Sequence, residues 1–183
     1  MSFTDFMLAV AVVGAGLLAG CVPIDRGEST APRGEAIAIS RGPCFGFCPV
    51  YDVAVSPGGR VDFEGKRNTV VLGTRSRSAG KAAYRKVSRS LAPLRPATGQ
   101  DVEFQCTAQP TDMSLFTIEW TSAHGARTVL RYQMGCRDEA AANIEQLIGE
   151  QLQTLSVKDW ADQKTRPGGG RQSRDTPSRA AEI

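Results

Sequence analysis

Short segments in which apolar and polar residues alternate, separated by turn residues, most strongly limit the folds open to this chain. In the first half, alternation runs through Glu35–Arg41, Val50–Ser56 and Arg60–Glu64, and Pro57-Gly58-Gly59 separates the last two segments. This period is typical of half-buried strands, and the Pro-Gly-Gly turn predicts a hairpin. We expect Thr69–Leu72 to add a further short strand.

The second half repeats this order in outline. Phe116, Ile118 and Trp120 alternate with polar residues, the turn Ser122–Gly125 follows, and Thr128–Met134 again places every second side chain on one face. This pattern predicts a second hairpin. The two halves show no sequence similarity that would indicate an internal duplication.

A helix is predicted after each hairpin, because the apolar spacing changes there. Over Ser78–Leu91 the apolar side chains recur at helical spacing, and Pro93 and Pro96 stop the pattern. A second helix is expected from about Asp138. Its apolar stripe consists of Ile144, Leu147, Ile148, Leu152 and Leu155. Hairpins followed by helices predict an α+β fold, with one antiparallel sheet and two helices packed on one face.

The N-terminal segment resembles the signal peptide of a bacterial lipoprotein. An apolar run from Phe6 ends in Leu18-Ala19-Gly20-Cys21, which resembles the lipobox where signal peptidase II cuts before a lipid-bearing cysteine. The resemblance implies that residues 1–20 are removed and that Cys21 anchors the protein in the cell envelope. Many lipoproteins kept in the inner membrane have Asp after this cysteine. Val22 at that position favours the outer membrane, with the protein facing the periplasm.

An uncleaved membrane anchor is the alternative. The apolar stretch Phe6–Val22 has 17 residues, whereas a helix needs roughly 20 to cross a bilayer. Its many small residues suit a peptidase site better than a stable span. The first five residues lack the Lys or Arg that usually precedes the apolar run, which a misassigned start codon would explain.

Composition divides the rest of the chain into three parts. Residues 21–34 are polar and rich in Pro and Gly, which indicates a flexible tether behind the lipid. Residues 35–160 carry the strand and helix patterns and form the predicted single domain. Residues 161–183 include Arg-Pro-Gly-Gly-Gly-Arg and no aromatic residue, so we expect a disordered basic tail.

Four cysteines remain besides Cys21. An even number of thiols in an oxidising compartment predicts disulfides, and four thiols allow three pairings. Gly46 permits the tight backbone that a bond between Cys44 and Cys48 requires. Cys106 and Cys136 each lie near the end of a predicted strand. We therefore favour the pairs Cys44–Cys48 and Cys106–Cys136.

The segment Pro43-Cys44-Phe45-Gly46-Phe47-Cys48-Pro49-Val50-Tyr51 resembles a known family. It is similar to the C-F-G-x-C-P-x-Y signature of a small bacterial envelope domain of unknown function that is often found in lipoproteins. The resemblance covers roughly residues 36–157, is sharpest over 40–65, and implies a fold but no biochemical activity. Cys106 and Cys136 are additions to the pattern.

The signature segment is the candidate binding loop. A disulfide there would fix two phenylalanines in place, and exposed phenylalanines on a rigid loop would form a contact patch. The candidate residues are Phe45, Gly46, Phe47, Pro49, Tyr51 and Asp52. Asp52 and Asp112 match the resembled pattern, and we expect them to bond turn backbone rather than to catalyse a reaction.

The alternative is a periplasmic thiol-redox or copper-handling protein that uses Cys44 and Cys48. Its spacing resembles the copper loop of Sco-type chaperones, which add a distant histidine on a thioredoxin-like fold. The one histidine here, His124, lies in a predicted turn, and redox enzymes usually have C-x-x-C at a helix N-terminus. The sequence therefore predicts neither a bound metal nor another cofactor.

Charge and catalytic patterns point away from an enzyme and from nucleic acid. With a single histidine, a Ser-His arrangement would depend on one loop residue, so no catalytic residue is predicted. The formal net charge of +3 is mild, and aromatic residues are not interleaved with the basic ones. The basic face of the first helix could contact an anionic envelope surface. Its residues are Lys81, Arg85, Lys86 and Arg89, together with Arg75 and Arg77 before the helix.

Overall fold

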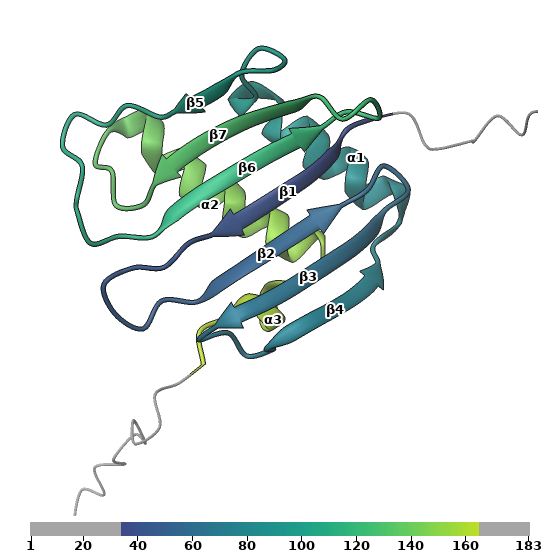
Figure 1. Ribbon diagram of the computed structural model, residues 1–183, viewed down its shortest axis with the longest axis horizontal. Coiled ribbons are helices and arrows are strands. Elements are labelled where there is room, and N and C mark those ends of the chain that lie inside the picture. Colours follow the sequence, from purple (N-terminus) through teal and green to yellow (C-terminus); the bar gives the residue numbers. More distant parts are fainter. Residues whose placement is uncertain (1–33, 165–183) are drawn as a thin grey trace, which may run out of the picture. The chain divides into compact units, whose positions relative to one another are not determined.

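The computed structural model describes residues 34–164, which form one sheet with helices on one of its faces (Figure 1). The predicted signal peptide, nearly all of the tether, and residues 165–183 of the predicted tail lie outside the described residues. Within 34–164, no helix has the length and apolar character needed to cross a bilayer.

Seven strands form the sheet in the order β4-β3-β2-β1-β6-β7-β5. Their bounds are β1 Ala36–Arg41, β2 Val50–Val55, β3 Arg60–Arg67, β4 Gly73–Ser78, β5 Asp101–Glu103, β6 Leu115–Thr121 and β7 Arg127–Gln133. All neighbours pair antiparallel except β5, which runs parallel to β7. The first strand is thus central, between the two predicted hairpins.

The helices α1 (Gly80–Leu91) and α2 (Glu139–Thr154) pack on one face of the sheet, behind the strands in Figure 1. The helical stripe predicted for α1 is buried through Tyr84, Val87 and Leu91. It packs with the inward side chains of the strands, such as Ile39 and Ile118. The prediction of an α+β fold with two helices on one face is confirmed. A 3₁₀ turn, Ala92–Leu94, and a short helix, α3 (Lys158–Ala161), complete the described elements.

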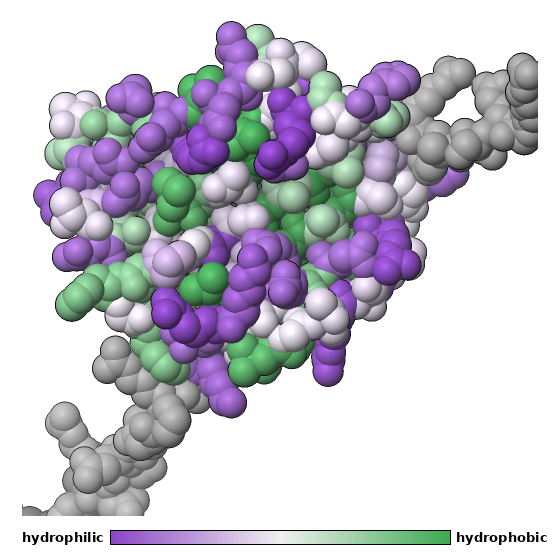
Figure 2. Space-filling model, viewed as in Figure 1, coloured by the Kyte–Doolittle hydropathy of each residue, from purple (hydrophilic) through white to green (hydrophobic). Residues whose placement is uncertain are grey.

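Polar and small side chains cover the other face of the sheet. In the space-filling view of this face, hydrophilic residues (purple) lie around a central area of pale and green residues (Figure 2). Four ion pairs join neighbouring positions on it: Asp52–Lys66, Arg60–Asp62, Glu119–Arg127 and Asp101–Arg131. This division of apolar and polar faces explains the strict alternation in β2, β3 and β6.

The strand predicted over Thr69–Leu72 is wrong in position, because β4 begins at Gly73. Residues 68–72 instead form the connection between β3 and β4, which approaches Gly65 so closely that a Cβ there would lie 1.8 Å from the carbonyl oxygen of Val71. β4 is hydrophilic and wholly exposed, so it lacks the alternation that would reveal it. Its inward-facing Arg75 and Arg77 lie over the ring of Trp160, at 5.5 and 5.9 Å from the ring centre.

The ordered chain continues past the predicted domain end at Trp160. Val70 N–H donates to the carbonyl of Asp162 at 2.9 Å, and Lys164 N–H donates to the carbonyl of Asn68 at 3.0 Å. Ala161 is buried. The first four residues of the predicted disordered tail, 161–164, therefore belong to the fold.

Candidate functional site

The signature loop, residues 42–49, connects β1 with β2 and contains the disulfide Cys44–Cys48. The two Cα atoms lie 5.8 Å apart, so the predicted pairing is confirmed. Gly46 has a φ of +145°, which favours glycine, and its N–H donates to the carbonyl of Cys44 at 2.9 Å. The role predicted for this glycine in closing the loop is borne out.

Hydrogen bonds from two other loops hold the signature loop. Phe45 N–H donates to the carbonyl of Asp112 at 3.2 Å, in the segment before β6. The side-chain amide of Asn68, after β3, donates to the carbonyl of Cys48 at 3.0 Å. Three loops that are distant in sequence thus meet at one end of the sheet, and the disulfide is one of several constraints on the signature loop.

Exposed large apolar side chains gather at this end. Phe45 has 89% of its surface exposed, more than any other large apolar residue of residues 34–164. Val70 and Leu72 in the β3–β4 connection, and Met113 in the segment before β6, are 56%, 60% and 41% exposed. We call these four residues the apolar loop end. The sequence analysis missed Val70 and Leu72 because it placed them in a strand, and no pattern in the sequence singled out Met113.

The other candidate loop residues do not share the exposure of Phe45. Phe47 is half-buried, so the expectation of two exposed phenylalanines holds for one only. Pro49 and Tyr51 are buried on the helix side of the sheet. Asp52 is half-buried on the opposite face and forms an ion pair with Lys66 rather than bonding turn backbone. Only Phe45 and Gly46 of the predicted set are exposed.

Tyr51 is 2% exposed and packs near the ring of Phe63, with 6.1 Å between ring centres. Burial raises the pKa of the Tyr51 hydroxyl to about 12, although the neighbouring guanidinium of Arg41 acts in the opposite direction. The hydroxyl therefore stays protonated at neutral pH and can donate a hydrogen bond.

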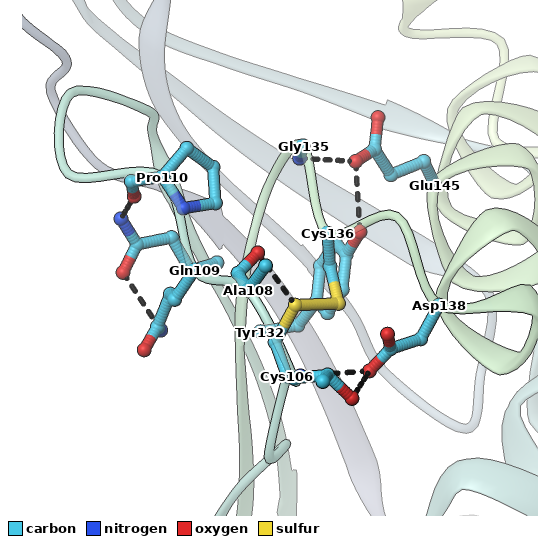
Figure 3. The surroundings of a disulfide bond; sticks show 11 residues. Cys106, Ala108, Gln109, Pro110, Tyr132, Gly135, Cys136, Asp138 and Glu145 are labelled. Carbon is cyan, nitrogen blue, oxygen red and sulfur yellow. Dashed lines mark hydrogen bonds between the residues drawn. A yellow bond between two sulfur atoms is a disulfide. The ribbon is translucent and has the colours of Figure 1, made fainter.

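The second disulfide, Cys106–Cys136, joins the segment after β5 to the connection between β7 and α2, with Cα atoms 5.9 Å apart (Figure 3). This pairing is also confirmed. Asp138 accepts hydrogen bonds from Thr107 through the backbone N–H, at 2.9 Å, and the hydroxyl, at 3.2 Å. The disulfide lies within a cross-linked junction of two segments.

Glu145, on α2, reinforces the same junction. Its Oε1 accepts hydrogen bonds from the Tyr132 hydroxyl and from the Gly135 N–H, both at 2.8 Å (Figure 3). Burial, together with the Glu145 carboxylate, raises the pKa of Tyr132. These contacts tie α2 to the end of β7 and give the region a structural role.

Within residues 34–164, the side chains that lie close enough together to share a metal ion are not free to bind one. Within residues 34–164, one cluster has the required spacing, namely Cys106, Cys136 and Asp138. Both of its sulfur atoms are in the disulfide and supply no thiolate. His124 is exposed in the β6–β7 turn, at the opposite end of the sheet from Cys44. His124 and the Cys44–Cys48 pair of the same molecule therefore cannot bind one metal ion together in this fold.

The predicted basic surface separates into two groups. Lys81, Arg85, Lys86 and Arg89 are exposed on the outer side of α1. Arg75 and Arg77 are instead held against Trp160, and Arg77 also donates to the carbonyl of Ser156 at 2.7 Å. We call the four helix residues the α1 basic face.

The fold and the loop define a small, disulfide-cross-linked α+β domain with an exposed aromatic residue on a constrained loop. Residues 35–152 match the family described as Domain of unknown function (DUF6438), and the chain belongs to this family. The match bears out the expected domain of unknown function. No curated protein matches the chain.

Proposed function

We propose that this protein is a lipid-anchored, non-enzymatic binding module of the cell envelope, and that the signature loop is its contact element. The observation that carries the proposal is the environment of Phe45. Its side chain is almost fully exposed, yet its backbone is bonded to Asp112 and enclosed by the Cys44–Cys48 disulfide. An aromatic residue fixed in this way loses little conformational freedom on binding, which favours a role as an interface anchor.

The position of the apolar loop end supports this proposal. β1 begins at Ala36, which pairs with Thr121, and ends at Arg41, which pairs with Phe116 beside the signature loop. The chain thus enters the domain at the end of the sheet opposite Phe45. A lipid on Cys21 would attach through residues 22–34 to that opposite end and leave the apolar loop end free for a protein partner.

The anchoring is tested on the N-terminal peptide of the protein purified from membranes. We expect mass spectrometry to find a chain that begins at Cys21 and carries the added mass of a diacylglyceryl group. A purified chain that still contains residues 1–20 would overturn the lipoprotein proposal and favour the alternative of an uncleaved membrane anchor. Fractionation of inner and outer membranes then tests the proposed outer-membrane location.

The contact element is tested by photo-crosslinking in cells. A benzoylphenylalanine at position 45 should form an adduct with a defined partner. The same residue at position 123, in the exposed turn at the opposite end of the sheet, is the matched control and should not form that adduct. Equal adducts at both positions, or none at position 45, would overturn the proposal.

The alternative, a thiol-redox or copper protein, depends on the same cysteine pair. The pair lies in a loop between two strands, so it lacks the helix N-terminus that stabilises thiolates in most C-x-x-C enzymes. Binding of Cu(I) by the reduced protein, followed by absorbance and mass, would favour copper handling. Absence of bound metal under reducing conditions would remove that alternative.

A further inference from the structure

A cavity of about 300 Å³ lies on the helix side of the sheet, beneath the start of β2. Arg41 at the end of β1 and Tyr51 in β2 line it from the sheet. Gln153, Lys158 and Asp162 line it from α2, α3 and the residue after α3. Its volume is at the lower end of the range for small-molecule sites, so it fits a small ligand or one chemical group of a larger one.

Arg41 is the unusual residue of this cavity. It is half-buried, and its guanidinium lies 5.7 Å from the centre of the Phe116 ring. Its Nε donates a long hydrogen bond, 3.4 Å, to the Ser114 hydroxyl, and its guanidinium also interacts with the Tyr51 hydroxyl. No carboxylate of residues 34–164 forms an ion pair with it. The other two half-buried arginines of residues 34–164 both have a counter-ion: Arg95 pairs with Glu35, and Arg131 pairs with Asp101.

A partly desolvated cation without a counter-ion is costly, and a planar guanidinium best satisfies its donors with a carboxylate. The buried Tyr51 hydroxyl lies beside Arg41 and adds a neutral donor, because burial keeps it protonated. These two side chains come from neighbouring strands, which hold their backbones at paired positions: Arg41 is the register partner of Tyr51.

The far wall of the cavity limits the charge of a ligand. Lys158 Nζ lies 2.8 Å from Asp162 Oδ1, so this cation is already neutralised by the acid at the wall. Arg41 is then the one unneutralised cation among the described lining residues, and Asp162 disfavours a doubly charged anion. A single negative charge suits this arrangement.

We propose that this cavity binds the carboxylate of a small ligand, with the Arg41 guanidinium and the Tyr51 hydroxyl as its donors. The carboxylate belongs to the C-terminus of a peptide or to a small organic acid. Because α3 and Asp162 lie after residue 152, the chain segment that closes the cavity lies beyond the matched family region. This site is independent of Phe45 and of the signature loop's proposed partner.

The test is calorimetric titration of the detergent-solubilised full chain with four probes: N-acetyl-alanyl-alanine, its C-terminal amide, propionate and inorganic phosphate. We expect at least one carboxylate probe to bind and the amide to bind at least about tenfold more weakly. Binding of the dipeptide alone identifies a peptide C-terminus, and binding of propionate alone identifies a small organic acid. Tighter binding of phosphate, equal binding of dipeptide and amide, or no binding of a carboxylate at about 10 mM would overturn the proposal.

Variants assign the binding to this cavity. Arg41→Lys keeps the charge and loses the planar fork, so carboxylate binding should fall about tenfold. Tyr51→Phe keeps the ring and removes one donor, and it should weaken binding severalfold even if Arg41→Lys does not fold. Arg89→Lys, on the exposed face of α1, is the control and should bind like the wild type. Wild-type affinity in a folded Tyr51→Phe or Arg41→Lys protein would overturn the assignment.

Discussion

The side chain of Asn68 donates a hydrogen bond of 3.0 Å to the backbone carbonyl of Cys48, which joins the β3–β4 connection to the disulfide of the signature loop. Asn68 also has a φ of +58°, a conformation that Asn and Gly adopt more readily than other residues. One residue thus shapes its own turn and holds a second loop.

Replacing Asn68 separates these two roles. Asn68→Gly keeps the backbone conformation and removes the donor, so we expect the free energy of unfolding to fall by about 1 kcal/mol. Asn68→Asp should cost more, since a carboxylate cannot donate and would face the carbonyl of Cys48. Urea unfolding measures both changes, and equal stability of all three proteins would contradict the role of this bond.

The two disulfides should contribute unequally to stability. Their sequence separations are 4 for Cys44–Cys48 and 30 for Cys106–Cys136. Chain entropy predicts losses of about 2 kcal/mol for the double alanine variant of the short loop and about 4 kcal/mol for that of the long one. Urea unfolding of the two double variants gives the order, and the reverse order would contradict this account.

Glu119 should make stability depend on acid pH. Hydrogen bonds from Arg127 lower the pKa of Glu119 below its ordinary value of 4.5, with the Nε donor 2.9 Å from Oε1. A carboxyl with a lowered folded-state pKa contributes stability that is present above 4.5 and lost as the pH falls through the folded value. Arg127→Gln should raise the pKa of Glu119 towards its ordinary value, so the free energy of unfolding should depend less on pH in the acid range.

Carboxyl NMR titration of Glu119 measures the effect directly. Arg137→Gln, at an exposed position between β7 and α2, is the charge-matched control and should leave the titration unchanged. An unaltered Glu119 pKa in Arg127→Gln would show that this ion pair does not persist in solution.

The α1 basic face should bind anionic membranes if it contacts an envelope surface. Each well-placed basic residue adds about 1 kcal/mol, so Lys81→Glu with Arg85→Glu should weaken binding of residues 31–183 to phosphatidylglycerol vesicles by at least tenfold. Binding should also weaken as salt is raised. Arg137→Glu with Lys164→Glu is the charge-matched control. Vesicle binding that does not change with salt concentration, or no vesicle binding, would contradict the proposal that the α1 basic face contacts an anionic membrane.

Most of the fold could be predicted because burial of one face of a strand or helix makes apolar residues recur in the sequence at a regular spacing. β2, β3 and β6 alternate strictly, and α1 carries its apolar stripe, so these elements were found. β4 was misplaced because Arg75 and Arg77 occupy its inward positions and cover Trp160 with their side chains. The strand order was not predictable from local patterns, since β1 pairs with β6 across most of the chain.

The candidate site was predicted in part. Cysteine spacing and Gly46 indicated the signature loop and both pairings, which depend on local geometry. The exposures of Phe45 and Phe47 differ, and this difference depends on neighbours from other loops. The cavity at Arg41 combines strand ends with α3, a set of long-range contacts that leaves no motif in the sequence.

The reduction potential of the Cys44–Cys48 pair, measured in the purified protein with peptide mapping, tests the central claim most directly. If the disulfide is a structural part of a binding loop held by Asn68 and Asp112, the potential should lie below about −300 mV. A potential between about −230 and −120 mV would place the pair among exchangeable disulfides. That result would contradict the binding-module account and favour a redox protein.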